Sequence, residues 1–398
     1  MAVKIGLYGI LGVYNFGCEA IVRGAYQFIQ LIYPNCEIIY FSHSPEFDKK
    51  ALWDLDIRIE PVIIRKTLTK RCVNKLLDIV NLNKRWLFFN ADRIIESVDV
   101  IFSIGGDIYT IPEILRKERK YKYYNPLIDF CDRAIKKGKT VIVYGASVGP
   151  WGEYSRAIHY NINALSKYRI ILCREEESIS YLKDLGLDNV LFFPDPAFQI
   201  RKLQIGQNKR YIGINLSPLS ICELYGECDE KHIKKLASLL DDVYKNVKID
   251  FMFIPHVLSD SINDNDLWFM EKVRDKMVYK KNVSFADSSN GFIGVKKYIS
   301  QCFIVVSARM HCAINAIDEN IPTIFLSYSQ KSIGMCKYIY GDDEFLIDLK
   351  NIDVELIPKI KNALSQYKLL SAKIASRNIE IKEYCESNIN RVRILLET

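Results

Sequence analysis

A strand followed at once by a helix is predicted at Cys302-Phe303-Ile304-Val305-Val306-Ser307-Ala308-Arg309-Met310-His311. The apolar, β-branched run of this stretch predicts a buried strand over 303–306. Ser307 then predicts the N-cap of a helix over 308–317, with Arg309 and His311 in its first turn. A helix start exposes backbone N–H groups and the positive end of the helix dipole, so it suits a phosphate or a carboxylate. We therefore expect an anion site here.

The same strand-then-helix pattern recurs along the whole chain. Strands are predicted at 4–9, 37–41, 98–104, 140–144, 169–172, 190–193, 211–215, 249–254, 303–306 and 323–326. Helices are predicted at 19–32, 121–137, 154–166, 178–185, 231–244, 265–277 and 308–317. Alternation of this kind predicts parallel sheets with helices on both faces. We expect an α/β protein of two Rossmann-like, doubly wound domains facing a cleft, at 1–200 and 208–355, joined by a polar linker and followed by a helical tail at 356–398.

Composition narrows the class of protein. The chain has 398 residues, of which 49% are hydrophobic and 26% charged, as in globular proteins. Its 55 Lys and Arg against 48 Asp and Glu give a net charge of +7, too mild for a nucleic-acid partner but suited to anionic substrates or an acidic membrane surface. Eleven scattered cysteines without a C-x-x-C pair predict reduced thiols and no metal site. We expect no signal peptide, no spanning segment and a cytoplasmic location, with the inner face of the cytoplasmic membrane as an open alternative.

Polar residues follow several predicted strands, where ligands bind in open α/β sheets. Asn15 and Gly17 follow the first strand, and Gly106 and Asp107 follow the strand at 98–104. Ser147 and Arg174 come after the next two strands. A carboxylate in a glycine-lined turn can act as a general base, but Asp107 can equally cap the next segment.

In the second half, His256 ends a strand, although a lone histidine is more often structural. Ser307, Arg309 and His311 converge on one helix start, which is a stronger signal. Gln330 and Lys331 close the next strand, where a solvated loop is an equal alternative. The five histidines show no H-x-x-H or H-E-x-x-H spacing, so we expect no metal.

In order and spacing, these fragments resemble the polysaccharide pyruvyl transferase family. The resemblance rests on Asn15-Phe16-Gly17-Cys18-Glu19-Ala20, Ser103-Ile104-Gly105-Gly106-Asp107, Tyr144-Gly145-Ala146-Ser147-Val148-Gly149-Pro150, Cys173-Arg174-Glu175-Glu176-Glu177-Ser178, Phe193-Pro194-Asp195-Pro196, Ile254-Pro255-His256, Ser307-Ala308-Arg309-Met310-His311 and Tyr328-Ser329-Gln330-Lys331. It implies a fold like the B-type glycosyltransferases, with the site between the domains. It also implies transfer of pyruvyl from phosphoenolpyruvate to a sugar as a cyclic ketal, with Asp107, Arg174, Arg309 and His311 functional. Many relatives carry a longer glycine run where this chain has Gly105-Gly106-Asp107.

From these patterns we predict a transferase that needs phosphoenolpyruvate as co-substrate and no further cofactor. Donor contacts are predicted at Ser307, Arg309, His311, Arg174, Gln330 and Lys331, and acceptor contacts at Asn15, Gly17, Gly106, Asp107, Ser147 and His256. His311 would protonate or stabilise the departing phosphate, Asp107 would take a hydroxyl proton, and Arg309 would hold the donor. The acceptor would be a surface polysaccharide or its lipid-linked precursor. Two alternatives stay open: a glycosyltransferase that uses a nucleotide sugar, and a non-catalytic sugar- or anion-binding protein.

Overall fold

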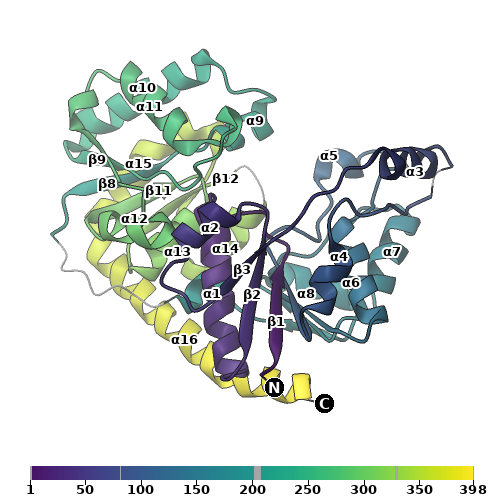
Figure 1. Cartoon of the computed structure of the whole chain (residues 1–398). Coiled ribbons are helices and arrows are strands. Elements are labelled where there is room, and N and C mark those ends of the chain that lie inside the picture. The colour runs from purple at the N-terminus through teal and green to yellow at the C-terminus, as the bar shows by residue number, and fades with distance from the viewer. Residues whose placement is uncertain (1, 81, 201–207, 328–329, 398) are drawn as a thin grey trace. The chain divides into compact units, whose positions relative to one another are not determined.

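Two parallel β-sheets organise the computed structural model, which describes residues 2–80, 82–200, 208–327 and 330–397 (Figure 1). The first sheet has the strand order β3-β2-β1-β4-β5-β6-β7, and the second has β10-β9-β8-β11-β12-β13. Both follow the Rossmann order. The second and third strands are added on one side of the first strand, and the later strands are added on its other side. The expectation of two Rossmann-like sheets is confirmed.

The central strands of the first sheet are short apolar runs that are buried on both faces, as parallel strands are. In β4, for example, all five residues are buried. Its strands are β1 (Lys4–Tyr8), β2 (Glu37–Ser42), β3 (Arg58–Pro61), β4 (Val100–Ile104), β5 (Thr140–Ala146), β6 (Ile170–Cys173) and β7 (Val190–Phe192). The helices between them are α1 (Phe16–Ile32), α2 (Pro45–Ala51), α3 (Leu68–Ile79), α4 (Ala91–Glu96), α5 (Glu113–Arg116), α6 (Pro126–Lys136), α7 (Ser155–Leu165) and α8 (Glu176–Asp184), and a 3₁₀ turn follows at Pro196–Gln199.

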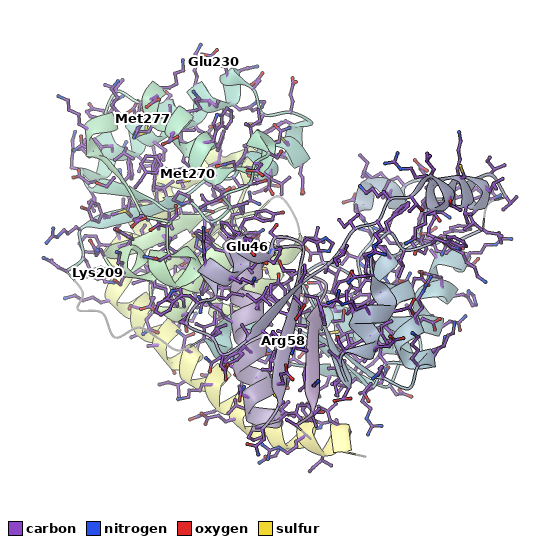
Figure 2. All side chains as sticks on the ribbon, in the orientation of Figure 1. Glu46, Arg58, Lys209, Glu230, Met270 and Met277 are labelled. Carbon is purple, nitrogen blue, oxygen red and sulfur yellow. The ribbon has the colours of Figure 1, made fainter. Side chains whose placement is uncertain are left out.

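The second sheet repeats the construction. Its strands are β8 (Tyr211–Asn215), β9 (Asp250–Phe253), β10 (Val283–Phe285), β11 (Cys302–Ser307), β12 (Thr323–Ser327) and β13 (Leu346–Asp348). Its helices are α9 (Pro218–Tyr225), α10 (Glu230–Val247), α11 (Asp266–Lys276), α12 (Gly291–Ile299), α13 (Met310–Asp318) and α14 (Gln330–Tyr340), followed by α15 (Ile352–Ser365) and α16 (Tyr367–Glu397). Met270 on α11 and Met277 just after it are buried in the core, whereas Glu230 pairs with lysines on the outside (Figure 2).

The two compact units do not follow the chain in two consecutive blocks. The first contains residues 1–13, 21–199 and 385–398, and the second contains residues 14–20 and 200–384. The start of α1 therefore belongs with the second sheet, and the end of α16 with the first. This differs from the expected division at 1–200, 208–355 and 356–398. None of the described helices is long and apolar enough to cross a bilayer.

The helix start after β11 differs from the sequence prediction. Helix α13 begins at Met310 with Arg309 as its N-cap, so the prediction of Ser307 as the N-cap is wrong. Ser307 is instead the last residue of β11, and its hydroxyl donates to the Arg309 carbonyl at 2.8 Å. This bond turns the chain through two residues before the helix begins, and it leaves His311 as the second residue of α13.

Candidate functional site

Four polar residues follow four neighbouring strands of the first sheet. Asp107 comes after β4, Ser147 after β5, Arg174 after β6 and Asp195 after β7. Because parallel strands end at the same edge of the sheet, this topology brings side chains together that are far apart in the sequence.

Arg174 is the centre of this group. Its Nη1 donates to Asp195 Oδ2 at 2.9 Å, its Nη2 to Asp107 Oδ1 at 3.3 Å, and its Nε to Ser147 Oγ at 3.1 Å. Ser147 in turn donates to Glu175. Gly106 makes room for the guanidinium, because a Cβ at this position would lie 3.0 Å from Nη2. We call Arg174, Asp107, Ser147, Glu175 and Asp195 the Arg174 cluster.

The Arg174 cluster presents a carboxylate, not a cation. The Arg174 side chain is 3% exposed and Asp195 is fully buried, whereas the Asp107 side chain is 39% exposed. Burial alone would lower the pKa of Arg174, but the charges of Asp195, Asp107 and Glu175 raise it, so the guanidinium stays ionised. One positive charge among three carboxylates makes this a poor site for a phosphate. Arg174 therefore holds Asp107 in place instead of reaching outward.

The second sheet has its own arginine, held at the ends of β8 and β11. Asn215, the last residue of β8, accepts hydrogen bonds from Arg309 N at 2.9 Å and from Ser307 Oγ at 3.3 Å. The Asn215 amide donates to Asp266 Oδ2 at 3.3 Å. Asp266 is the first residue of α11 and also accepts from the backbone N–H groups of His256 and Val257.

Arg309 is anchored by two aspartates. Its Nε and Nη2 donate to Asp266 Oδ1 at 3.1 and 2.8 Å, and Nη2 also donates to Asp264 Oδ1 at 2.7 Å. Burial raises the pKa of Asp266, and the neighbouring Arg309 opposes this rise. Nη1 makes no hydrogen bond to any residue that the structure describes. Two N–H donors of a rigidly held guanidinium are therefore available to a ligand.

His311 lies on the first turn of α13, against the start of α1. A Cβ on Gly17 would come within 2.6 Å of His311 Nδ1, so only glycine lets the two helix starts approach this closely. The segment before Gly17 is fixed by Phe16 N, which donates to the His256 carbonyl at 2.9 Å, and by the bridge between Asn15 and Val257. His311 thus sits near the positive ends of two helices, which favour an anion beside it.

The start of α1 is held in the second unit by Glu19 as well. This buried carboxylate accepts a hydrogen bond from Phe292 N at 2.8 Å, at the start of α12. Gly291 has a φ of +60°, and a Cβ there would lie 2.1 Å from Glu19 Oε2. The motif from Asn15 to Glu19 is therefore explained by packing around His311 and α12.

His256 is 1% exposed, packed edge-on against Phe16 and Phe292. Burial, followed by the nearby charges of His311 and Arg309, lowers its pKa to about 3, so the imidazole is neutral. Neither ring nitrogen has a hydrogen-bond partner within the described residues. In this arrangement His256 supports the start of α1 and is not placed to meet an acceptor sugar.

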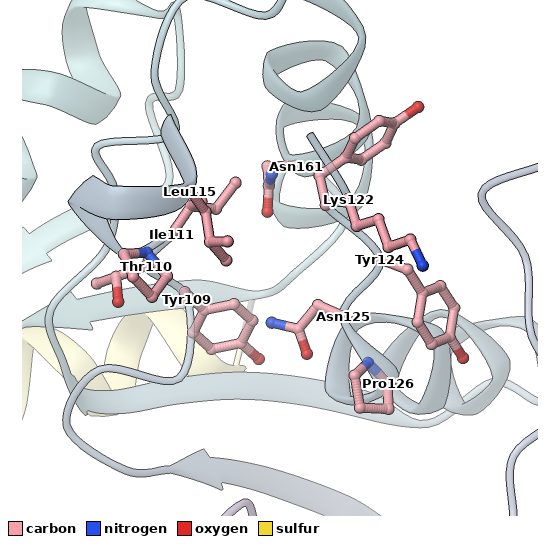
Figure 3. A pocket seen from close by; sticks show the side chains of 11 residues that line it. Tyr109, Thr110, Ile111, Leu115, Lys122, Tyr124, Asn125, Pro126 and Asn161 are labelled. Atoms are coloured by element: carbon pink, nitrogen blue, oxygen red, sulfur yellow. The ribbon is translucent and has the colours of Figure 1, made fainter. Parts of the chain in front are cut away.

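The first unit also contains a pocket of about 190 Å³, lined mostly by residues 109–126 (Figure 3). Thr110 is one of the lining residues, and both its N–H and its hydroxyl donate to the backbone carbonyl oxygen of Asp107. The lining combines tyrosine rings with amide and amine side chains: Tyr109, Thr110, Ile111, Pro112, Leu115, Lys122, Tyr123, Tyr124, Asn125, Pro126 and Asn161. Aromatic faces beside amide groups suit a sugar ring.

The comparison with known families decides the identity. The sequence model of the polysaccharide pyruvyl transferase family matches residues 15–330. The chain belongs to this family. The protein is therefore a transferase, and the two motifs that end in Asp107 and His311 both lie inside the matched range.

Solved structures show the same fold at low sequence identity. HepE of Anabaena, crystallised with UDP and glucose, is similar with a TM-score of 0.61 and 9% identity over 100% of both chains. A glycosyltransferase from Rickettsia africae has a TM-score of 0.55 and 11% identity over 100% of this chain and 99% of its own. The UDP-GlcNAc 2-epimerase of Methanocaldococcus jannaschii has a TM-score of 0.53 and 10% identity over 92% of this chain and 93% of its own. This pyruvyl transferase thus shares the two-sheet architecture of B-type glycosyltransferases and related epimerases.

Within this transferase, the sequence-predicted residues fall into two groups. Gly106, Asp107, Ser147 and Arg174 lie together in the first unit, and Asn15, Gly17, His256, Ser307, Arg309 and His311 lie together in the second. Helix α14 begins at Gln330, but the side chains of Gln330 and Lys331 are outside the described part of the structure.

Three of the aspartates that hold the two arginines, Asp195, Asp264 and Asp266, were missed as site residues. Asp195 follows β7 just as Asp107 follows β4, so its place at a strand end was a usable signal. Asp264 and Asp266 lie before and at the start of a helix, where acidic residues are common, so nothing local marked them as partners of Arg309.

Proposed function

We propose that this protein transfers the pyruvyl group of phosphoenolpyruvate to two hydroxyls of one sugar, in a surface polysaccharide or its lipid-linked precursor, and so forms a pyruvate ketal. The observation that carries the proposal is the start of α13, where His311 and the anchored Arg309 lie side by side on the strand-turn-helix of the family motif. Membership of the polysaccharide pyruvyl transferase family supports the same reaction.

The reaction requires two proton transfers and one leaving group. One sugar oxygen attacks the central carbon of phosphoenolpyruvate while the vinyl CH₂ takes up a proton and becomes the methyl group. The bond between that carbon and the phosphate oxygen breaks, and the second hydroxyl takes its place. Of the two protons that leave the hydroxyls, one ends on the methyl carbon and the other leaves with inorganic phosphate. The enzyme therefore needs an acid, a base and a site for a dianion.

We assign the donor to the start of α13. Phosphoenolpyruvate carries a phosphate and a carboxylate, which suit Arg309 Nη1 and the helix N-terminus. Asp264 and Asp266 hold the guanidinium so that it binds without first losing rotamer freedom. His311 is the general acid for the departing phosphate. Ser307 orients the turn through its bond to the Arg309 carbonyl.

We assign the acceptor hydroxyl to Asp107. Its carboxylate is the exposed member of the Arg174 cluster, and an ionised carboxylate accepts a proton from a hydroxyl that is being deprotonated by attack. Arg174 acts as a positioning residue, because its guanidinium is buried under Asp107 and shared with Asp195. The pocket lined by Tyr109 and Asn125 would hold part of the acceptor sugar.

Mass spectrometry of reaction products tests the proposal. The full chain is incubated with phosphoenolpyruvate and extracted lipid-linked glycans, and inorganic phosphate is measured in parallel. We expect a glycan heavier by one pyruvate ketal, with one phosphate released per ketal. Incubation with a panel of nucleotide sugars is the matched comparison. Glycosyl transfer from one of them, with no phosphate release from phosphoenolpyruvate, would overturn the proposal in favour of a glycosyltransferase.

A further inference from the structure

We propose that the first unit carries a membrane-docking surface that binds anionic lipid headgroups. The surface consists of the described residues of segment 64–86, which includes α3, and of residues 113–124, which include α5; we call it the α3–α5 face. This face contains none of the residues around Arg174 and Arg309 that are described above, and lipid binding by it does not depend on the reaction proposed above. Three observations support it: the orientation of α3, the charge of the two segments, and the way the segments meet.

Helix α3 has its apolar side turned toward solvent. Leu68, Cys72, Leu76 and Ile79 follow one another at spacings of four, four and three, so they form a single stripe along the helix. Leu68, Leu76 and Ile79 are 79%, 59% and 72% exposed, and Cys72 is exposed too. A helix that packs on a protein core has the opposite orientation.

The inward side of α3 is held by a polar residue. Asn74 is buried and bonded twice to the backbone of Trp86, from its Nδ2 to the carbonyl at 3.1 Å and from Trp86 N to its Oδ1 at 2.7 Å. Lys70 donates to the Leu87 carbonyl at 2.6 Å. These hydrogen bonds fix the helix in this orientation, so the exposed stripe is a built feature of the structure.

The α3–α5 face carries more positive charge than the whole chain. Its two segments contain twelve Lys and Arg residues against three Asp and Glu, a net charge of +9. The complete chain has +7, so all other residues together carry −2. On α3, Arg71 and Lys75 flank the apolar stripe, and both are exposed. Basic side chains beside exposed apolar ones are typical of helices that lie in the interface of an anionic membrane.

The two segments meet in one surface. Lys122 Nζ lies 3.8 Å from Asp78 Oδ1, and the Arg85 guanidinium lies 5.6 Å from the centre of the Tyr124 ring. Figure 1 shows α3 and α5 labelled close together in the first unit. Further apolar side chains are exposed on the same segments, at Val80, Leu82, Trp86 and Ile114. A tryptophan at such a site suits the headgroup layer of a bilayer.

Charge complementarity favours a lipid surface as the occupant of the α3–α5 face. Among the described residues, three of its twelve cations, Arg85, Lys117 and Lys122, pair with an acidic residue of the face. An anionic bilayer supplies many negative charges to the others without demanding a fixed geometry. The pocket of Figure 3 shares Leu115 and Lys122 with this face. A molecule anchored in the bilayer by a lipid tail would therefore reach the pocket from the docked surface.

Vesicle flotation of the full chain tests this inference without any substrate. We expect binding to vesicles of phosphatidylcholine and phosphatidylglycerol in equal amounts, weak binding to phosphatidylcholine alone, and a steep loss with added salt. Leu68→Ser/Leu76→Ser/Ile79→Ser should lower the vesicle partition coefficient at least about tenfold. These side chains are exposed in the folded protein, so the apolar contact that the substitutions remove is the contact with the bilayer. Arg71→Glu/Lys75→Glu should lower it by a similar factor.

Matched controls lie elsewhere on the surface. Val278, Val354 and Leu369 are 79%, 72% and 68% exposed, so Val278→Ser/Val354→Ser/Leu369→Ser removes similar exposed apolar area. Lys231→Glu/Lys368→Glu reverses two exposed charges. Both controls should bind like the wild type. Equal binding to neutral and anionic vesicles, or undiminished binding by the α3 triple variant, would overturn the inference. So would self-association in sedimentation velocity that the same triple variant abolishes, because the occupant would then be a second copy of the chain.

Discussion

The two arginine sites use the same construction to present opposite chemistry. Arg174 and Arg309 each lie just beyond a parallel strand, and each donates to two aspartates. In the first unit the guanidinium is buried and the Asp107 carboxylate is exposed. In the second, Asp266 is buried, Arg309 is 11% exposed beside the 30% exposed Asp264, and Arg309 Nη1 donates to none of the described residues. All three nitrogens of Arg174 donate within its cluster, whereas those of Arg309 do not, so the two sites differ in the donors that the anchoring groups leave unused and not in residue type.

The largest expected effect is the loss of turnover when His311 of the second unit is replaced. His311→Ala should lower kcat by about 10²- to 10⁴-fold, because it removes the general acid for phosphate departure. Phosphate release from phosphoenolpyruvate with a glycan acceptor measures it. His159→Ala, at an exposed histidine of α7, is the matched control and should keep full activity. Undiminished ketal formation by His311→Ala would remove the role that we assign to this residue.

Arg174→Met should weaken the first unit's fold by about 3–5 kcal/mol, because it leaves the fully buried Asp195 without its cation. Urea unfolding measures the change. Arg58→Met is the control, since Arg58 is exposed beside Glu37 and Glu60 and should cost about 0–1 kcal/mol. The double variant Arg174→Met/Asp195→Leu should recover part of the loss. Equal costs for the two arginines would contradict the structural role of Arg174.

Asp107→Asn should separate activity from stability within the Arg174 cluster. We expect kcat to fall by about 10²-fold, because an amide takes up no proton from the acceptor hydroxyl. Stability should change by less than about 1 kcal/mol, since Asp107 is exposed and Arg174 keeps Asp195. Asp92→Asn, at an exposed carboxylate paired with Lys137, serves as the control. Wild-type turnover in Asp107→Asn would exclude a general base here.

The smallest expected effect is the pH dependence of the free energy of unfolding that the neutral His256 imidazole contributes. The pKa of His256 is lowered to about 3 in the folded chain from an ordinary 6.5, so the unfolded chain binds the proton first. Its contribution to stability is complete above about pH 6.5 and is lost as the pH falls toward 3, with a slope of up to about 1.4 kcal/mol per pH unit. Unfolding free energies at pH 7 and pH 5 should therefore differ more in the wild type than in His256→Leu. Equal differences in both proteins would contradict a buried neutral imidazole.

The fold was largely predictable because its strands are compact apolar runs. The strand ending in Asn215 was predicted at its observed bounds, and the run before Ser307 within one residue at each end. The edge strands β3, β10 and β13 were missed, since three or four half-exposed residues such as Arg58–Pro61 carry no periodic signal. Helix α3 was missed although the spacing of Leu68, Cys72, Leu76 and Ile79 was a usable helical signal.

The candidate site was predictable in its residue types but not in its partners. Asp107, Arg174, Arg309 and His311 were recognised from strand ends and from the family motif. The pairing of Arg174 with Asp195, and of Arg309 with Asp266, depends on which strands become neighbours, and single-sequence patterns do not contain that information. The association of Gly17 with His311 has the same cause, because it rests on bonds such as Phe16 N to the His256 carbonyl.

Titration calorimetry with phosphoenolpyruvate alone tests the division of labour between the two arginine sites most directly. In Arg309→Lys, phosphoenolpyruvate should bind about tenfold more weakly. A lysine ammonium cannot make both hydrogen bonds that Nε and Nη2 donate to Asp266, and it has no second nitrogen in the place of Nη1. In Asp107→Asn the Kd for phosphoenolpyruvate should match that of the wild type. A weakened Kd in Asp107→Asn together with an unchanged Kd in Arg309→Lys would contradict the account.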